Sequence, residues 1–589
     1  MTGQIMRRSG VRRPGVRRRV AGLCAGLTAA VVLLSGCQVG EGSSSGLPSQ
    51  PTQSASGSGA AGSGSGSGSA GTEDSLPKLS WKRATASAVA DPPVASFNPA
   101  AHDVFTGYTS PDRQSGTGSA TPKGFSSAPA GAGMSRYLDQ QISWTACGSF
   151  QCGTVLVPLD WDSPDGQAIT LTMKRKQATE RSGNRPAKGT MFINPGGPGV
   201  SGQDMLTSFE TGSFPGYDVI AWDPRGSGQS TPVACGTAAQ TDAFFDLDSS
   251  PDSSAQWSAV IAGNKAFAQQ CRRASGALLD HISTIDTARD LDYLRTRVGD
   301  PKLNYLGISY GTFIGATYAE MYPRRVGRMV LDSAVNITSN DSVSQVMGFD
   351  KAFHAFAGWC ARNDKECGLG GSADEVVRRT QNFLAGLDSR PLTVGSRSLT
   401  QNQAATGIAF YLYSGVDSYK YLAGALGWAM ERGQGKYLLA AADSLNGRDV
   451  ETGKWDNSAY AFPAILCKDS ADPGLAGARA QWEIDQRRAP LLGRPFGVGL
   501  VCTYWTAKPA TQLRISARGA APIVVLGVTG DPATPYQQAQ WMAQQMSSAV
   551  LVSWRGAGHS AWSLGNSCLR NSVTGYLNGG VVPRNGLTC

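Results

Sequence analysis

Three residues in the second half of the chain have types and positions suited to nucleophilic catalysis. Ser309 lies in the sequence GISYG at residues 307–311, Asp531 follows an apolar run, and His559 lies in GAGHS at residues 556–560. A serine hydroxyl is a weak nucleophile until a base takes its proton, and a carboxylate can hold that base in the correct tautomer. We therefore expect acyl transfer through Ser309, with His559 as the base and Asp531 as its partner.

The residues around Ser309 support its role as the nucleophile. Residues 303–306 predict a strand before it, and residues 312–321 predict a helix after it. In a strand–turn–helix of this kind the serine sits on a sharp turn with its hydroxyl exposed, and the flanking glycines let the strand and the helix approach. Backbone amides must bind the oxyanion. We expect them from Tyr310 and from Gly197, in the loop NPGGPG at residues 194–199.

The base is chosen from four histidines. His102 lies in an expected linker, His281 precedes a predicted helix, and His354 lies in an expected cap. Only His559 follows a late strand, where the chain order Ser, Asp, His requires the base. For Asp531 the alternative is a cap of the helix after it, and its position ahead of His559 favours the triad.

Short apolar runs alternate with helical patterns and predict an α/β fold. The expected strands are residues 153–159, 168–173, 191–194, 218–222, 303–306, 329–332, 523–526 and 549–552. The first two are expected to be antiparallel. Strands alternating with helices, such as residues 284–298, predict a mostly parallel sheet covered by helices. The long helical stretch after the sixth strand predicts an inserted cap.

The N-terminus predicts export. Seven arginines and no acid precede an apolar stretch from Val20 to Leu34, which ends in LSGC at residues 34–37. This layout is typical of a secretory signal and is too short for a membrane span. Its ending resembles the bacterial lipobox, which implies removal of residues 1–36 and acylation of Cys37. An ordinary signal peptide with a chance cysteine is the alternative, and the export route, Sec or Tat, stays open.

Charge and cysteines agree with an exported protein. The net charge falls from +9 to +2 without the seven arginines, so the sequence does not indicate nucleic-acid binding. Ten cysteines remain after Cys24 and Cys37, an even number typical of an oxidising compartment. No C-x-x-C pair occurs and no histidines cluster near the cysteines, so we do not expect a metal site. As a hypothesis we pair the cysteines locally: Cys147–Cys152, Cys235–Cys271, Cys360–Cys367, Cys467–Cys502 and Cys568–Cys589.

The chain divides into five predicted parts, of which the first is the signal peptide at residues 1–36. Residues 37–136 are rich in Gly, Ser and Pro and predict a lipid-attached linker. We expect the folded part to begin near Tyr137. Residues 137–335 form the first part of the core, residues 336–519 the cap, and residues 520–589 the C-terminal part of the core.

A dinucleotide-binding fold is the rival interpretation. Residues 197–202 match G-x-G-x-x-G, and Asp223 ends the next predicted strand. However, exported proteins seldom meet a dinucleotide pool, the preceding strand is not the first of the sheet, and Ser309, Asp531 and His559 would have no role. We therefore favour the hydrolase.

Four motifs carry a family resemblance: NPGGPG at residues 194–199, WDPRGSGQS at 222–230, TARDLD at 287–292 and GISYGT at 307–312. Over roughly residues 143–589 the chain resembles the proline iminopeptidase-like α/β-hydrolases, in the branch of secreted tripeptidyl aminopeptidases and mycelium-associated lipoprotein proteinases. The resemblance implies an α/β-hydrolase fold with a helical cap and a TAP-like C-terminal part. It also implies cleavage near a free peptide N-terminus without a metal or cofactor. Proline iminopeptidases usually have His in place of Asn194, and some relatives have been regarded as esterases.

Three functions follow from these observations. The first is a serine aminopeptidase that releases short peptides, above all tripeptides. The second is a carboxylesterase on the same triad, and the third is a non-catalytic surface-binding lipoprotein, which the intact triad disfavours. We expect a monomer on the extracellular face of the membrane, held only by its lipid and in part released, whose partners are peptides with a free N-terminus.

An exopeptidase must also recognise the substrate's ammonium group, and a carboxylate in the cap is the natural partner. The cap offers several acids, among them Asp469, Asp472, Glu483 and Asp485. The motif AILCKD at residues 464–469 resembles a cap motif of the branch, and a bridge between Cys467 and Cys502 would hold Asp469 in place. We choose Asp469, although a solvated loop acid or a helix cap is the alternative for each of these acids.

Overall fold

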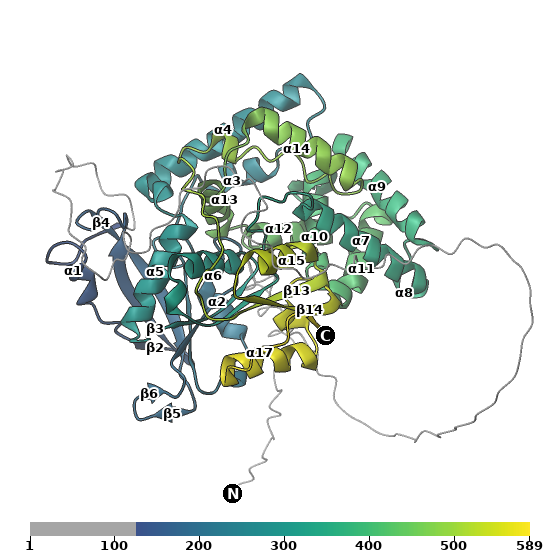
Figure 1. Ribbon diagram of the computed structural model, residues 1–589. Helices are drawn as coiled ribbons and strands as arrows, with labels where there is room; N and C mark the ends of the chain where they lie inside the picture. The colour runs from purple at the N-terminus through teal and green to yellow at the C-terminus, as the bar shows by residue number, and fades with distance from the viewer. Residues whose placement is uncertain (1–124) are drawn as a thin grey trace, which may run out of the picture.

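The computed structural model describes residues 125–589 (Figure 1). The predicted signal peptide, Cys37, His102 and nearly all of the predicted linker lie outside the described residues, so our expectations for them stay predictions. Within residues 125–589 no helix is both long and apolar enough to cross a membrane.

A large mixed sheet forms the centre of the molecule. Its eleven strands follow the order β15-β14-β13-β10-β9-β7-β8-β4-β3-β2, with β1 paired to β4. From β8 to β15 neighbouring strands run parallel, whereas β1, β2, β3, β4 and β8 pair antiparallel. The mostly parallel sheet is therefore confirmed. Its strands are β1 Phe125–Ser127, β2 Thr145–Cys147, β3 Phe150–Pro158, β4 Gln167–Lys176, β7 Thr190–Asn194, β8 Asp218–Trp222, β9 Leu303–Ile308, β10 Val326–Asp332, β13 Ile523–Gly530, β14 Ala549–Ala557 and β15 Leu587–Thr588.

Helices cover both faces of this sheet because successive strand side chains point to opposite sides. Phe192 lies in a core cluster with α5, α6 and α15, whereas its neighbours Met191 and Ile193 lie in a second cluster with α2, α16 and α17. The strand is therefore buried on both faces, as its continuous apolar sequence predicts. The core helices are α1 Ser135–Leu138, α2 Gly202–Ser208, α5 Thr284–Arg297, α6 Tyr310–Met321, α15 Tyr536–Gln545, α16 Ala561–Leu564 and α17 Ser567–Gly579.

A largely helical cap follows β10, and its helices surround a separate apolar cluster. One small hairpin, β11–β12, interrupts the helices; another, β5 Arg181–Ser182 with β6 Arg185–Pro186, lies in the core. The cap elements are α7 Gln345–Arg362, α8 Asp364–Cys367, α9 Ala373–Ser389, β11 Leu392–Val394, β12 Arg397–Leu399, α10 Gln401–Leu412, α11 Tyr419–Arg432, α12 Lys436–Asn446, α13 Ser458–Asp469 and α14 Gly474–Arg488.

The cap has a second part that the sequence did not lead us to expect. Helices α3 (Ala238–Phe245) and α4 (Ser254–Ser275) follow β8, yet they lie with α13 and α14 at the top of the molecule in Figure 1. The rings of Trp257 in α4 and Trp482 in α14 meet edge to face at 6.0 Å, and the Arg479 guanidinium lies 3.8 Å from the Trp257 ring centre. The cap is therefore formed by two insertions into the core, one after β8 and one after β10, which together make a roof over the sheet.

The described fold begins before Tyr137, the boundary expected from composition. Strand β1 pairs with β4, so residues 125–127 join the sheet, and Met134 is buried against its core. All five expected cysteine pairs are disulfide-bonded, among them Cys467–Cys502, which ties the end of α13 to a later turn.

Candidate active site

Ser309 stands on a sharp turn between β9 and α6, with φ 57° and ψ −127°. Non-glycine residues seldom adopt this strained backbone, which is typical of functional sites. Two backbone hydrogen bonds hold the turn: Ser309 N–H donates to the Asp332 carbonyl at 2.9 Å, and Thr312 N–H donates to the Ser309 carbonyl at 2.8 Å. A Cβ on Gly307 would lie 2.4 Å from the Gly311 carbonyl oxygen, so the strand and helix require glycine there.

His559 and Asp531 form a buried pair at the carboxyl ends of two neighbouring parallel strands. Nδ1 of His559 lies 2.9 Å from Oδ1 and 3.0 Å from Oδ2 of Asp531. Nε2 of His559 is buried and has no hydrogen-bond partner among residues 125–589. His559 and Ser309 line the same cavity. The structure thus brings all three predicted triad residues to one site, with the second imidazole nitrogen left to act on the serine.

The loop after β13 fixes the Asp531 carboxylate. Its Oδ1 accepts from the amides of Ala533 at 3.0 Å and Thr534 at 2.9 Å, while its Oδ2 accepts from the Thr534 hydroxyl at 3.0 Å. Four donors, counting His559, therefore surround one carboxylate and fix its orientation. Thr534 was not among the predicted site residues, although its position three residues after an aspartate is typical of a turn in which Asp binds the backbone.

The electrostatic surroundings favour a charged His559. Burial alone would lower its pKa, but the charge and hydrogen bond of Asp531, with a smaller contribution from the charge of Asp332, outweigh it, so the pKa is raised above the ordinary 6.5. An imidazole that gains a proton readily suits the role of general base.

Asp332, at the end of β10, holds the loop that carries His559. Its carboxylate accepts from the Ser560 hydroxyl at 2.9 Å and from the amides of Ala561 at 2.9 Å and Trp562 at 3.0 Å. These bonds cap α16, so Asp332 acts on the imidazole through the backbone. Sequence analysis missed this residue because its partners lie more than 220 positions later.

The cap also contacts the histidine loop directly. The backbone N–H of His559 donates to the Tyr413 carbonyl at 2.7 Å, and the rings of the two residues meet edge to face at 5.3 Å between centres. A Cβ on Gly415 would lie 2.2 Å from the Ala557 carbonyl oxygen, so the approach is close enough to require glycine. The cap thereby takes part in positioning the base.

The predicted oxyanion-binding amides lie beside Ser309. A Cβ on Gly196 would lie 2.7 Å from Tyr310 N and 2.9 Å from the Ser309 Cβ, so the loop after β7 packs against the nucleophile turn. Gly196 N–H donates to the Asn194 side chain at 2.9 Å, which bends this loop, and Gly197 lines the cavity. Tyr310 begins α6, where the first amides have no partner within the helix. This arrangement suits an oxyanion hole.

The cavity at Ser309 has a volume of about 370 Å³ and a mostly apolar wall. No Asp, Glu, Lys or Arg is among the described residues that line it. The core contributes the loop after β7, and both parts of the cap contribute the roof. Its aromatic lining consists of Phe244, Phe245, Phe349, Tyr413, Phe462 and Phe496.

Asp469 is the predicted site residue that the structure places elsewhere. It does not line the cavity at Ser309. Its Oδ1 accepts from Thr284 N–H at 2.8 Å, and its Oδ2 accepts from the Thr284 hydroxyl at 2.7 Å and from the Tyr310 hydroxyl. Burial raises the pKa of the Asp469 carboxyl to about 6, although these hydrogen bonds act to lower it. Asp469 therefore joins the start of α5 to the residue after the nucleophile, and this geometry does not support a role in binding the substrate's amino group.

The motif residues of the dinucleotide alternative have structural partners. Asp223 accepts from the Ser201 hydroxyl at 2.8 Å and, through its other oxygen, from the Gln203 amide group at 2.7 Å. Arg225, two residues later, is fully buried and forms a two-pronged ion pair with Asp290, both contacts at 2.7 Å. The acid that would bind a ribose is therefore engaged within the protein.

The remaining candidates lie away from the triad. Nδ1 of His281 is 3.8 Å from Asp160, and Nδ1 of His354 is 2.9 Å from the Asp350 carbonyl. Within residues 125–589 no three His, Cys, Asp or Glu side chains are grouped as metal ligands would be. Of the cap acids, Asp472 and Glu483 are exposed, whereas Asp485 is buried.

Known proteins resemble this chain over most of its length. Residues 189–563 match the family described as alpha/beta hydrolase fold. Serine protease Hip1 of Mycobacterium tuberculosis is 35% identical over 491 residues, covering 77% of this chain and 91% of that protein. Tripeptidyl aminopeptidase of Streptomyces lividans is 31% identical over 477 residues, with 77% and 86% covered. Carboxylesterase B of Mycobacterium tuberculosis is 34% identical over 479 residues, with 76% and 90% covered.

Proposed function

The chain belongs to the alpha/beta hydrolase fold family and is a serine hydrolase, and from this premise we propose that it removes short peptides, above all tripeptides, from free N-termini. Two of the relatives described above are peptidases by name, which supports a peptide substrate. The observation that carries the proposal is the roofed cavity at Ser309, of about 370 Å³. A space of this size suits a small ligand or a chain end rather than the interior of a folded chain.

The proposed mechanism assigns one role to each site residue. Nε2 of His559 takes the Ser309 proton as Oγ attacks the scissile carbonyl, and Asp531 stabilises the imidazolium through Nδ1–H. The amides of Gly197 and Tyr310 bind the oxyanion. His559 then gives its proton to the leaving amine, which leaves the N-terminal peptide esterified to Ser309. Water, deprotonated by His559, hydrolyses this acyl-enzyme and restores the serine.

Esterase activity on the same triad is the second candidate. The absence of charged side chains from the described wall of the cavity at Ser309 supports it, because an apolar acyl group fits such a wall without a charged partner. One relative is a carboxylesterase by name. A purely non-catalytic surface lipoprotein is not supported by a site in which the nucleophile, base and acid meet.

Three matched substrates separate these functions: an apolar tripeptide anilide with a free amine, its N-acetylated form, and an aryl ester. An exopeptidase cleaves the free-amine anilide far faster than the acetylated one. Equal rates on the two anilides would reject the exopeptidase, and activity on the ester alone would establish the esterase.

We further propose that the enzyme works on the extracellular face of the membrane. The support is the signal-like N-terminus, the LSGC sequence ending at Cys37 and the Gly/Ser-rich segment after it. A segment of this composition and length would separate the catalytic part from the lipid surface. Lipid at Cys37 would be the attachment, with part of the protein released.

A further inference from the structure

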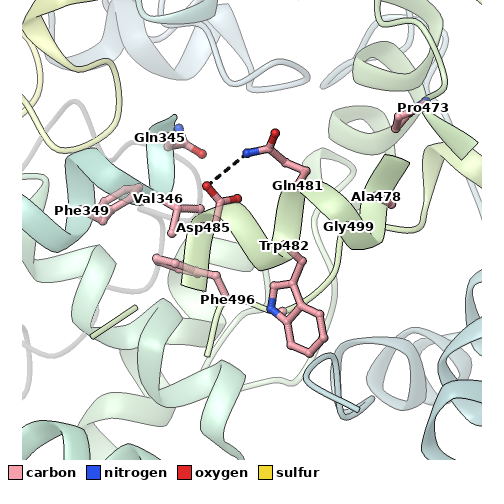
Figure 2. A pocket seen from close by; sticks show the side chains of 11 residues that line it. Gln345, Val346, Phe349, Pro473, Ala478, Gln481, Trp482, Asp485, Phe496 and Gly499 are labelled. Atoms are coloured by element: carbon pink, nitrogen blue, oxygen red, sulfur yellow. Dashed lines mark hydrogen bonds between the residues drawn. The ribbon is translucent and has the colours of Figure 1, made fainter. Parts of the chain in front are cut away.

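A second cavity, of about 360 Å³, adjoins the cavity at Ser309 (Figure 2). Gln345, Phe349 and Phe496 line both cavities, so these three side chains stand between the two spaces. The far side of the second cavity is formed by α14, including Trp482 and Asp485. A substrate held at Ser309 reaches α14 by passing these shared side chains, which the proposal below requires.

Asp485 is the only charged group among the described residues that line either cavity, leaving aside His559. Its carboxylate is buried, with 9% of the residue exposed, and it forms no ion pair within residues 125–589. Its Oδ1 accepts from the Ser344 hydroxyl at 2.8 Å and from the Gln481 amide at 3.2 Å. A buried carboxylate without an ionic partner in the protein is a suitable site for a cationic ligand.

The nearby cations are directed elsewhere. The Arg488 guanidinium, one turn later on α14, donates to the Ser342 carbonyl at 3.2 Å. Arg494 binds Asp252 and Asp388. Asp485 therefore has no cationic partner among the described residues, and a cationic ligand in the cavity would supply one.

Polar groups around Asp485 suit an ammonium ion. Figure 2 shows its carboxyl group between the amide ends of Gln345 and Gln481. The Gln345 amide NH₂ donates to the Ala533 carbonyl at 3.0 Å, which leaves its carbonyl oxygen as an acceptor. Ala533 belongs to the loop that holds Asp531, so this acceptor is fixed relative to the triad. An ammonium has three donors and no acceptor, as these oxygens require.

We propose that Asp485 binds the free N-terminal ammonium of the peptide substrate. The inference rests on the proposed exopeptidase function and names the subsite that gives it specificity. In this arrangement the ammonium end of the substrate lies in the second cavity and its scissile carbonyl lies at Ser309. The apolar side chains between them lie against Phe349 and Phe496. The distance between Asp485 and Ser309 then fixes the length of the released peptide.

The test compares Asp485→Asn with the wild type on an apolar tripeptide anilide, on its des-amino analogue, in which hydrogen replaces the ammonium group, and on an aryl ester. Asparagine keeps the shape and can still accept from Ser344 and Gln481. We expect kcat/KM on the free-amine anilide to fall about ten- to a hundredfold, the range for a hydrogen bond to a charged group. The fall should lie mainly in KM, and rates on the des-amino anilide and the ester should change little.

Glu483→Gln is the matched control, since it removes the same charge from an exposed position two residues away on α14; it should leave all three rates unchanged. If Asp485→Asn does not fold, Asp485→Glu tests the same point, because it keeps the charge and moves the carboxylate by one methylene: the preference for the free amine should stay and the product length should change, and an unchanged product length would overturn the proposal. A second readout is product length on an oligoalanine ladder: one length from the wild type, and mixed lengths from the variant.

Each outcome decides a separate point. If the wild type prefers the free amine and Asp485→Asn keeps that preference, the subsite is wrong and the exopeptidase stands. Equal losses on anilide and ester would give Asp485 a structural role through Ser344, which caps α7, and would overturn the proposal. A wild type without any preference for the free amine would overturn the exopeptidase and the subsite together.

Discussion

Replacing Asp531 by asparagine should move the imidazole proton of His559 from Nδ1 to Nε2 and so remove the general base. In the wild type, Oδ1 accepts from two backbone amides and Oδ2 accepts from the Thr534 hydroxyl, while both oxygens lie within 3.0 Å of Nδ1 of His559. The amide oxygen of asparagine will keep the two backbone donors, so its NH₂ must take the place of Oδ2. A donor then faces Nδ1 of His559, the proton moves to Nε2, and the imidazole can no longer accept the Ser309 proton.

The magnitude follows from losing the correct tautomer while keeping the geometry. The corresponding change in serine proteases lowers kcat about 10⁴-fold, equivalent to about 5 kcal/mol of transition-state stabilisation. A second effect concerns pH. Burial lowers the His559 pKa and the Asp531 charge raises it, with a net raised value in the wild type. The base must be neutral, so activity is lost as pH falls through this pKa, and the acidic limb of the variant should move to lower pH.

The assay is hydrolysis of an aryl ester from pH 5 to 9, with thermal melting of both proteins to check the fold. Asp472→Asn, at an exposed cap acid, is the control for loss of one negative charge. A loss below tenfold in a folded Asp531→Asn protein, or an acidic limb that does not move, would refute the assignment of Asp531 as the partner of His559.

Three further predictions concern stability and attachment. Asp290→Asn should lower the free energy of unfolding by about 3–5 kcal/mol, because Arg225 stays buried without its partner; urea unfolding measures this, and a loss under about 1 kcal/mol would contradict it. The wild type should lose up to about 3 kcal/mol of unfolding free energy relative to Asp469→Asn as the pH rises from about 4 to 7, because folding raises the pKa of the Asp469 carboxyl to about 6 and its ionisation then destabilises the folded state. Urea unfolding of both proteins at several pH values measures this. A difference in unfolding free energy that is independent of pH would show that the pKa of Asp469 is not raised. Cys37→Ala should release soluble protein, since acyl chains supply the membrane binding, and variant protein that stays with membranes after a high-salt wash would exclude the lipid anchor.

Local sequence predicted the sheet strands β3, β4, β7, β8, β9, β10, β13 and β14, but not β1, β2 and β15, and it placed the three triad candidates at strand ends. Ser309, Asp531 and His559 each directly follow a strand of the sheet or lie within a few residues of its end, so strand order alone places them at one edge. The apolar runs are continuous because the strands are buried on both faces, and this made them visible in the sequence.

The parts that were missed depend on contacts between distant segments. Helices α3 and α4 follow a core strand, and their helical pattern does not reveal that Trp257 meets Trp482, 225 positions later. The expected role of Asp469 lacks structural support for the same reason, because its partner Thr284 precedes it by 185 positions. The sequence does not distinguish a cap carboxylate that binds the start of a helix, as Asp469 does, from one that lines a cavity, as Asp485 does.

The central claim is that Ser309 is the nucleophile of a serine hydrolase, and labelling with a fluorophosphonate tests it most directly. The wild-type protein and Ser309→Ala are incubated with the probe, digested and mapped by mass spectrometry, with melting curves recorded for both. We predict that the label lies on Ser309 in the wild type and that it disappears, together with hydrolysis, from a folded Ser309→Ala protein. Label on another serine, or hydrolysis that survives the substitution, would contradict the account.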